Sequence, residues 1–262
     1  MSYETIRIEQ DGQGIARLIL ARPEKHNALN AAMIGELTDA ARSLGARSQI
    51  RAIVLQSDGG TFCAGADLDW MRQQFGASRE TRISQARALA HMLRALNEMP
   101  KPLIAAVQGA AYGGGVGMIS VCDTAITSDT AKFGLTETRL GLIPATIGPY
   151  VLARIGEANA RRGILSARVF DASEAKRIGL IGDVVRPAEL DTKITSEAAA
   201  FLSVAPGAVA SAKALIRRLS IPITDDLIED TISRLADAWE TAEVAEGLSA
   251  FFEKRKPAWL VT

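Results

Sequence analysis

Two short apolar runs, each followed by a stretch rich in glycine and alanine, most constrain the fold of this chain. Residues 53–55 precede the first stretch, residues 62–67, and residues 103–107 precede the second, residues 113–115. Such runs are typical of buried strands, and small residues beyond a strand end let the backbone approach a ligand closely because no Cβ intervenes. Two turns whose N–H groups are directed at one point can form an oxyanion hole. The pattern predicts catalysis on a carbonyl, although tight packing alone would explain either turn taken singly.

Strand and helix signals alternate over the first 190 residues and then give way to helical spacing alone. Alternating apolar residues around a glycine-containing turn predict a hairpin, and Asn30 is a suitable N-cap for the helix that follows. We expect an α/β core over residues 1–190 and a helical region over residues 191–262, with no linker between them. The expected strands are residues 6–8, 15–20, 51–56, 103–107, 124–127 and 182–185, and the expected helices are residues 31–47, 68–74, 79–98, 115–121, 194–202, 208–219, 226–245 and 246–256.

The 262 residues include 30 Lys and Arg against 30 Asp and Glu, so no net charge attracts nucleic acid or an anionic membrane. The two cysteines, Cys63 and Cys122, are too few for a disulfide framework or a zinc site, and we expect buried free thiols. The N-terminus lacks the apolar segment of a signal peptide, and no apolar run approaches the roughly 18 residues of a membrane span. These features favour a soluble, cytoplasmic protein without nucleic-acid or membrane partners.

The second glycine stretch invites comparison with nucleotide-binding motifs, and it matches neither of the two common ones. A dinucleotide fingerprint anchored on Gly113 and Gly115 would need its third glycine at Met118, and a P-loop starting at Gly109 has Gly115 where lysine is required. No serine is flanked as in the hydrolase motif G-x-S-x-G, and neither histidine has a metal-ligand spacing. Nucleotide, serine-hydrolase and zinc chemistry therefore lack their signatures, and we expect no metal site.

One acidic residue after the second glycine stretch is the candidate general acid or base. Glu137 is flanked by Gly134, Leu142 and Pro144, and this setting suggests a partly desolvated pocket. Desolvation would raise the pKa of the carboxyl group toward the value that a general acid or base needs. The alternative is a glutamate that caps a helix or faces solvent.

Taken together and in order, the segments resemble the enoyl-CoA hydratase/isomerase (crotonase) superfamily, and methylglutaconyl-CoA-hydratase-like members in particular. The resemblance covers nearly the whole chain and implies an α/β fold in which ββα units form a spiral, followed by a C-terminal helical trimerisation region. It also implies a homotrimer, or a hexamer formed as a dimer of trimers, and an acyl-CoA thioester as substrate with no separate cofactor. The segments that carry the resemblance are residues 22–23, 27–29, 62–67, 109, 113–115, 122–123, 133–134, 140–144, 246–247, 250–251 and 253–254.

The resemblance also implies roles for individual residues. The backbone N–H groups of Ala66 and Gly114 would bind the thioester oxygen, and Glu137 matches one of the two catalytic glutamates of a standard hydratase. A lysine near a phosphate agrees with ordinary charge pairing, while a solvated basic helix end is the alternative for the C-terminal tail. The positions that would contact coenzyme A are Ala28, Ala64, Asp67 and Leu68 along the adenine and pantetheine, and Lys25, Phe251 and Lys254 at the 3′-phosphoadenosine, Lys254 from this or a neighbouring subunit.

One position departs from the family pattern, because Gly117 stands where a standard hydratase has its other glutamate. Loss of a general acid usually costs about 10²–10⁴-fold in rate. A hydratase with this sequence would therefore use Glu137 twice, recruit another group or rely on its substrate. We interpret Gly117 as room for a substrate with a second carboxylate, and expect a glutaconyl-type thioester (methylglutaconyl or isohexenylglutaconyl) from leucine or acyclic-terpene breakdown.

Two other functions remain open from the sequence. A Δ3-Δ2 enoyl-CoA isomerase moves one proton from C2 to C4, and Glu137 alone would suffice for that reaction. A non-catalytic CoA-binding or RNA-associated protein is the other, although the balanced charge argues against RNA. Apolar stripes on the C-terminal helices favour an oligomer with threefold symmetry. The residues of these stripes are Ala208, Leu215, Leu219, Ile232, Leu235 and Trp239.

Overall fold

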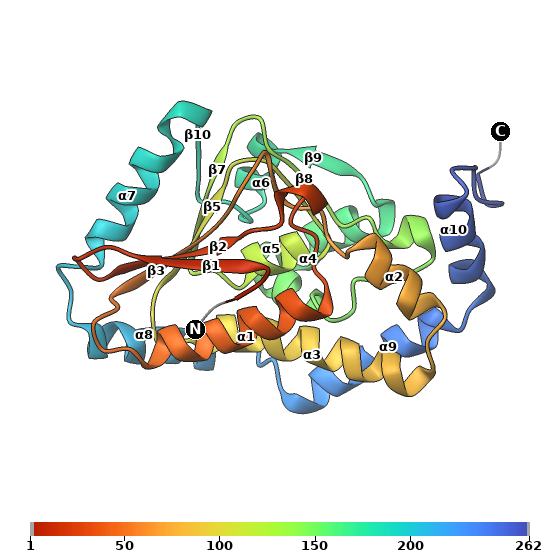
Figure 1. Ribbon diagram of the computed structural model, residues 1–262, viewed down its shortest axis with the longest axis horizontal. Helices are drawn as coiled ribbons and strands as arrows, with labels where there is room; N and C mark the ends of the chain where they lie inside the picture. The colour runs from red at the N-terminus through yellow and green to blue at the C-terminus, as the bar shows by residue number, and fades with distance from the viewer. Residues whose placement is uncertain (1–2, 261–262) are drawn as a thin grey trace.

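The structure, a computed structural model that describes residues 3–260, contains two β-sheets enclosed by helices (Figure 1). The larger sheet has six strands in the order β1-β2-β3-β5-β7-β10. The β1–β2 hairpin is antiparallel, and the other neighbours pair in parallel. The strands are β1 (Ile6–Gln10), β2 (Ile15–Leu20), β3 (Ala52–Ser57), β5 (Leu103–Val107), β7 (Thr124–Ser128) and β10 (Asp183–Val185).

The smaller sheet has four strands of three residues each, in the order β4-β6-β8-β9. The first three run parallel to one another, and the last pairs antiparallel with its neighbour. The sequence analysis does not predict this sheet, because three residues are too few to show the alternation of a strand. The strands are β4 (Thr61–Cys63), β6 (Ala110–Tyr112), β8 (Lys132–Gly134) and β9 (Val169–Asp171).

A repeating strand–strand–helix unit builds both sheets. β3 and β4 precede the helices α2 (Leu68–Phe75) and α3 (Arg79–Glu98), and β5 and β6 precede α4 (Gly114–Ser120). β7 and β8 then precede the 3₁₀ helix η2 (Glu137–Leu140) and α5 (Gly148–Ser166). The first strand of each unit joins the larger sheet and the second joins the smaller one. This arrangement is the expected spiral of ββα units, and the α/β class is confirmed.

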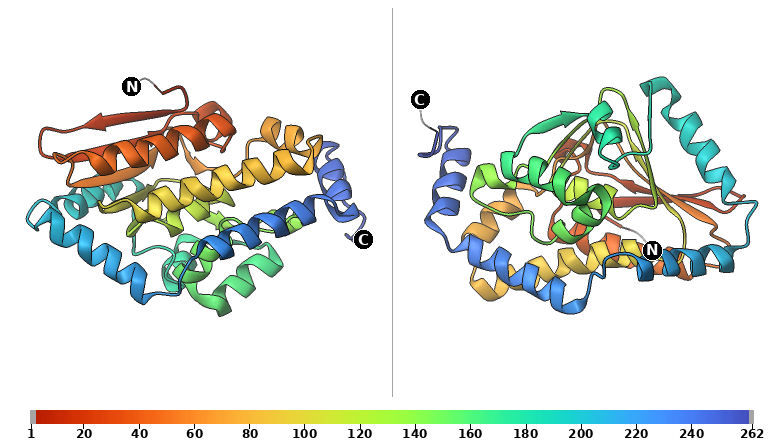
Figure 2. Two further views of the ribbon diagram at one scale, coloured as in Figure 1. Left: turned by 90° about the horizontal axis from the view of Figure 1, so that it is seen from below. Right: turned by 180° about the vertical axis from the view of Figure 1, so that it is seen from behind.

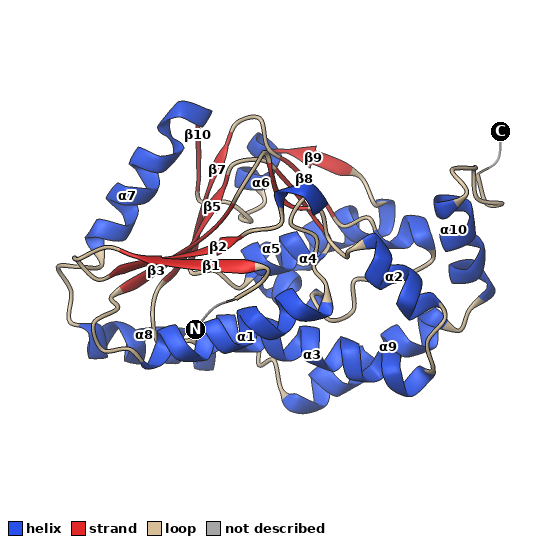
Figure 3. Cartoon of the chain, in the orientation of Figure 1, coloured by secondary structure: helices blue, strands red, loops and turns tan. Residues whose placement is uncertain are grey.

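Helices cover the sheets on more than one side (Figure 2). α1 (Ala31–Ala46), α3 and α9 (Asp225–Trp239) lie side by side along one side of the molecule, whereas α7 (Leu190–Ala200) packs on the other face of the larger sheet. Figure 3 shows α10 (Ala242–Phe252) at the opposite end of the molecule from α7 and α8 (Pro206–Leu219). The remaining helices are α6 (Ala172–Arg177), η1 (Pro23–Lys25) and η3 (Pro187–Glu189).

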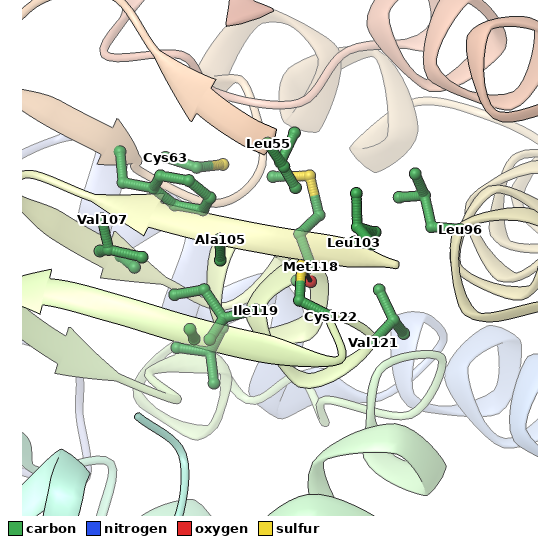
Figure 4. Packing of buried hydrophobic residues seen from close by; sticks show 14 of the residues in the cluster. Leu55, Cys63, Leu96, Leu103, Ala105, Val107, Met118, Ile119, Val121 and Cys122 are labelled. Carbon is green, nitrogen blue, oxygen red and sulfur yellow. Dashed lines mark hydrogen bonds between the residues drawn. The ribbon is translucent and has the colours of Figure 1, made fainter. Parts of the chain in front are cut away.

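β5 divides the hydrophobic core between the two faces of the larger sheet. Leu103, Ala105 and Val107 point into the main core, where side chains of α4 pack against them (Figure 4). Ile104 and Ala106 alternate with them and face a second cluster, to which α7 contributes. Successive side chains of a strand point to opposite faces, and a parallel strand covered on both faces is apolar throughout. This is why the uninterrupted apolar run predicts the strand correctly.

Most predicted elements are confirmed, including the N-cap of α1, where the Asn30 side chain accepts a hydrogen bond from Met33 N at 2.9 Å. Two helices were expected over residues 226–245 and 246–256, and the structure contains two, but the expected boundary between them is wrong. The chain leaves the helical path after α9, and Thr241 caps the next helix, α10, by accepting a hydrogen bond from Val244 N at 3.3 Å.

The helical C-terminal region begins with α7 at Leu190, close to the expected boundary, and the division into two domains stays a prediction. The apolar stripes expected on its helices have different surroundings. Leu215 and Leu219 of α8 are 58% and 77% exposed, whereas Ile232 of α9 is buried against α3. The expectation of unpartnered apolar faces therefore holds for α8 and is wrong for the buried part of α9.

Both cysteines are free and buried, and burial raises the pKa of each thiol to about 12. Across residues 3–260, the structure contains no helix that is both long enough and apolar enough to cross a membrane.

Candidate active site

A cavity of about 570 Å³ is lined by residues that follow β4, β6 and β8 and by residues of α2, α3, α9 and α10. Its wall is mainly apolar, and the lining residues of the described chain with side chains of the acidic or basic types are Arg82, Glu137 and Arg139. A largely apolar cavity with a few polar groups is the usual form of a small-molecule site. Ala66, Gly114 and Glu137, the positions predicted to carry the chemistry, all line this cavity.

The two predicted glycine turns meet at one side of the cavity. Gly113 has a φ of +48°, and a β-carbon on it would lie 2.8 Å from Glu137 Oε1 and 3.9 Å from Gly65 Cα. Glycine is required there by the left-handed backbone and by the close approach of its neighbours. The first turn, the second turn and the candidate acid are thus brought together. We call Ala66, Gly113, Gly114 and Glu137 the turn wall of the cavity.

The backbone of Ala66 is held by a single parallel bridge to Leu29. Leu29 N donates to Gly65 O at 2.7 Å, and Asp67 N donates to Leu29 O at 2.9 Å. In a parallel pairing, the residue between two such bonds turns its own N–H and C=O to the opposite side. Ala66 lines the cavity, and its N–H points away from Leu29.

Gly114 is the first residue of α4 and also lines the cavity. The N–H groups of a first helical turn have no acceptor within the helix, and a helix N-terminus favours negative charge. The N–H group of the preceding residue, Gly113, already has an acceptor, because it donates to Gly134 O at 2.9 Å. Ala66 and Gly114 therefore lie where the oxyanion-hole prediction requires, and that role stays a prediction.

Glu137 begins η2 and is half-buried, and its carboxyl group lies near Gly113 in the turn wall. Oε2 is buried and has no hydrogen-bond partner within residues 3–260. Burial raises the pKa of Glu137 to about 7. A hydrogen bond from its own backbone N–H acts to lower the pKa, but this effect is weaker. A carboxyl group with a buried, unpartnered oxygen and a pKa near neutral pH has the properties of a general acid or base.

Three of the residues predicted to contact coenzyme A line the cavity. Ala64 follows β4, Leu68 begins α2 and Phe251 lies near the end of α10. Leu68 and Phe251 are 47% and 45% exposed. These residues lie at the part of the cavity that is open to solvent, and their binding role stays a prediction.

Other predicted contacts lie outside the cavity lining. Lys25 is exposed, and its ammonium group pairs with Asp69 at 3.0 Å. Lys254 is exposed on the segment after α10, with a φ of +56°, and Ala28 is buried beside η1. These three positions are not among the cavity-lining residues, and their binding role stays a prediction.

Asp67 has a structural role that the sequence analysis does not predict. Its buried carboxylate accepts a hydrogen bond from Arg22 Nη2 at 2.9 Å and caps α2 by accepting from the backbone N–H groups of Asp69 and Trp70. Burial acts to raise the pKa of Asp67, but Arg22 and the backbone donors outweigh it and hold the pKa below its usual value. Asp67 does not line the cavity; it ties the first turn to Arg22.

The expectation that Gly117 leaves room for substrate is wrong. Gly117 is buried within α4, and a β-carbon on it would lie only 2.5 Å from Cγ2 of Ile147. Ile147 lines the cavity, whereas Gly117 does not. An isoleucine side chain from the segment before α5 therefore fills the space beside the missing second glutamate.

The cavity lining also contains residues that the sequence analysis does not assign to the site, although it names Trp239 as part of an apolar stripe. Gln74 of α2, Arg82 and Gln85 of α3, and Trp239 of α9 all line the cavity, and we call them the helical wall. Arg82 and Gln85 are three residues apart, a spacing that places two side chains on one face of a helix. That signal is visible in the sequence, but which helix faces meet is decided by the tertiary structure.

Comparison with known proteins agrees with this geometry. The sequence profile of a family described as enoyl-CoA hydratase/isomerase matches residues 10–261 of the chain. The chain belongs to the enoyl-CoA hydratase/isomerase family. A relative from Mycobacterium tuberculosis, named "Probable enoyl-CoA hydratase echA8", is 36% identical over 98% of both chains.

Two further relatives are informative. The mitochondrial protein of Rattus norvegicus named methylglutaconyl-CoA hydratase is 35% identical over 96% of this chain and 81% of its own length. A crystal structure described as an enoyl-CoA hydratase from Shewanella pealeana superposes with a TM-score of 0.81 at 38% identity, covering 98% of this chain and 96% of that one. Family membership and the crotonase-type fold are thereby established over nearly the full length.

Proposed function

We propose that this chain is an enoyl-CoA hydratase that adds water to a 2-enoyl-CoA thioester. The observation that carries the proposal is the position of Glu137, an unpaired carboxyl group with a pKa of about 7 beside two turns that present backbone N–H groups. The names of relatives at about 35% identity support the same reaction. An intact set of these groups argues against a non-catalytic CoA-binding protein.

In the proposed mechanism, the thioester oxygen accepts hydrogen bonds from the N–H groups of Ala66 and Gly114. The Glu137 carboxylate takes a proton from water, and the resulting hydroxyl group adds to C3. The electrons of the C2=C3 bond then move to form an enolate, whose oxygen is stabilised by the two donors. Loss of one such donor typically costs about 10²–10³-fold in rate. The proton on Glu137 returns to C2 and completes the addition.

We further propose a glutaconyl-type thioester as the preferred substrate. Among the lining residues of the described chain, Glu137 is the one carboxylate, so a second carboxylate on the acyl group would meet little repulsion. The rat relative is named for a substrate of this class. The absence of the second glutamate does not enlarge the cavity, because the Ile147 side chain fills the space beside Gly117.

The second candidate is a Δ3-Δ2 enoyl-CoA isomerase. That reaction needs one carboxylate to move a proton, so the single lining carboxylate supports it equally well. A panel of acyl-CoA thioesters followed by ultraviolet absorbance separates the two reactions. Hydration of a 2-enoyl thioester removes the conjugated chromophore and lowers its absorbance, whereas isomerisation of a 3-enoyl thioester creates it. We expect loss of absorbance with glutaconyl-type and simple 2-enoyl thioesters. A gain with 3-enoyl thioesters, without any loss with 2-enoyl ones, would contradict the proposal.

We also propose that the protein is a homotrimer or a dimer of trimers. The exposed apolar residues of α8 and the following segment support this, since Leu215, Ile216, Leu219 and Ile221 are 58–77% exposed. Light scattering at micromolar concentration should give about three or six times the chain mass of 27.9 kDa. A stable monomer would contradict the proposal.

A further inference from the structure

The helical wall contains a group of hydrogen-bond donors in an otherwise apolar region, and several of them have no protein acceptor in the described residues. Arg82 is half-buried, lines the cavity and has no carboxylate partner within residues 3–260. Every other lining residue from α3 and α9, apart from Gln85, is alanine, leucine or tryptophan. A guanidinium group in such surroundings keeps its positive charge, so this wall carries a net positive charge.

The Arg82 guanidinium is held in a fixed orientation. Its Nε donates to Gln74 O at 2.9 Å, and its Nη2 donates to Phe75 O at 3.0 Å, both at the C-terminal end of α2. The group also lies 5.5 Å from the centre of the Trp239 ring. These contacts use two of its three nitrogens and leave Nη1 without a protein partner in the described residues.

Two side-chain amides accompany Arg82. Gln74 is only 7% exposed, lines the cavity, and its amide makes no hydrogen bond within residues 3–260. Gln85, one turn beyond Arg82 on α3, is half-buried and likewise unpartnered in the described chain. Neither amide is among the fully buried polar groups that lack a partner. Both are therefore accessible from the cavity, where a bound ligand can accept their hydrogen bonds.

We propose that Arg82, Gln74 and Gln85 form a subsite that binds a carboxylate at the end of the acyl group. The inference rests on the proposed function, since it concerns the acyl part of a CoA thioester. A carboxylate has two oxygens that accept several hydrogen bonds, and arginine and amide N–H groups are suitable donors. The one lining carboxylate, Glu137, belongs to the turn wall and not to this subsite.

The competing explanation is that Arg82 has a purely structural role and caps the end of α2. Arginine near a helix C-terminus often binds the last carbonyl groups. That explanation accounts for the two hydrogen bonds of Arg82. It gives no part to Nη1, which has no protein partner in the described residues, or to the two amides that line the same cavity. The two explanations differ in one respect: only a subsite distinguishes a charged acyl end from a neutral one.

The test measures binding of two saturated thioesters by calorimetry. Glutaryl-CoA carries a terminal carboxylate, and its neutral isostere carries an isopropyl group in its place. Neither contains a double bond, so the result does not depend on hydration. We expect the wild-type protein to bind glutaryl-CoA more tightly. Arg82→Met should reduce that preference by at least about 30-fold, because truncating one member of a buried charged pair costs about 2 kcal/mol or more.

Two further variants make the test decisive. Arg87→Met is the matched control, since Arg87 lies on α3 but pairs with Glu229 on the surface at 2.7 Å, and it should leave the preference unchanged. Gln85→Glu places a negative charge in the proposed subsite and should weaken glutaryl-CoA binding selectively. It also keeps the proposal testable if Arg82→Met does not fold.

The proposal is overturned if the wild-type protein binds the neutral isostere as tightly as glutaryl-CoA. It is also overturned if Arg82→Met weakens both thioesters equally while Gln85→Glu has no selective effect. A selective loss in a protein that hydrates no 2-enoyl thioester would support the subsite and contradict the proposed function. Hydration of 2-enoyl thioesters without any preference for glutaryl-CoA would support the proposed function and contradict the subsite.

Discussion

The two walls of the cavity are built from different parts of the chain. The turn wall presents backbone groups at strand ends and at the start of α4, with Glu137 as its one ionisable side chain. The helical wall presents side chains from α2, α3 and α9. Backbone groups are fixed by the strand pairing around them, whereas side chains on a helix can be exchanged singly. The difference suggests that the turn wall determines the reaction and the helical wall determines the substrate.

The largest expected effect concerns the acid of the turn wall. Glu137→Gln should lower turnover by about 10²-fold or more, because amide nitrogen cannot accept or return the proton. Binding of a saturated acyl-CoA should change little, because the proposed thioester contacts are backbone groups. Glu157→Gln, on the surface of α5 where Glu157 pairs with Arg161, is the control. Wild-type turnover of Glu137→Gln on every thioester would show that the catalytic residue is misassigned.

The same substitution should change how stability depends on pH. Glu137 titrates near pH 7 in the folded protein and near 4.5 without burial. Between these values the folded state keeps a proton that the unfolded chain has lost, so wild-type stability falls as the pH rises. Glu137→Gln removes this dependence and should be more stable above pH 7 by up to about 3 kcal/mol, with no difference below pH 4.5. Denaturant unfolding at several pH values measures it, and parallel curves would contradict the prediction.

A matched pair of glycines tests the packing behind the turn wall. Gly117→Ala forces a β-carbon against Ile147 and should destabilise the protein by about 1–3 kcal/mol. Gly35→Ala, in the middle of α1 with open space around it, should stabilise by about 0.5–1 kcal/mol. Adding Ile147→Ala to Gly117→Ala should restore part of the loss. Equal effects of the two glycine substitutions would mean that Ile147 does not fill the space.

The smallest effect is expected outside both walls. Lys25 is paired with Asp69 at the surface, and an exposed ion pair contributes about 0.2–1 kcal/mol. If Lys25 contacts the 3′-phosphate of coenzyme A, Lys25→Met should weaken CoA binding by a few-fold and leave dephospho-CoA binding unchanged. Calorimetry with the two compounds makes the comparison, and an equal change for both would remove Lys25 from the binding site.

The sequence predicts the turn wall better than the helical wall for a physical reason. The turns follow directly from local signals, namely an apolar strand, small residues and a nearby acid. The helical wall depends on which faces of α2, α3 and α9 meet, and helical spacing alone does not determine this. Gly117 was misinterpreted for the same reason: Ile147, which fills its space, lies 30 positions further along the chain.

The fold shows the same limit. Five of the six strands of the larger sheet have five or six residues and are long enough to be predicted, whereas β10 and all four strands of the smaller sheet have three. Those strands are defined by pairing with distant residues, such as Thr61 with Ala110 and Phe133 with Phe170. The helices α5 and α6 were also missed, and the glycine at position 156, with a φ of +74°, interrupts the helical pattern of α5.

The titration of Glu137 near neutral pH has a consequence for the direction of the reaction. Hydration begins with the carboxylate, which takes a proton from water, and the reverse elimination begins with the same carboxylate, which takes a proton from C2. The acid that each direction needs later is formed in that first transfer. With a pKa of about 7, about half of the protein holds the carboxylate at neutral pH, and this same fraction is competent in either direction.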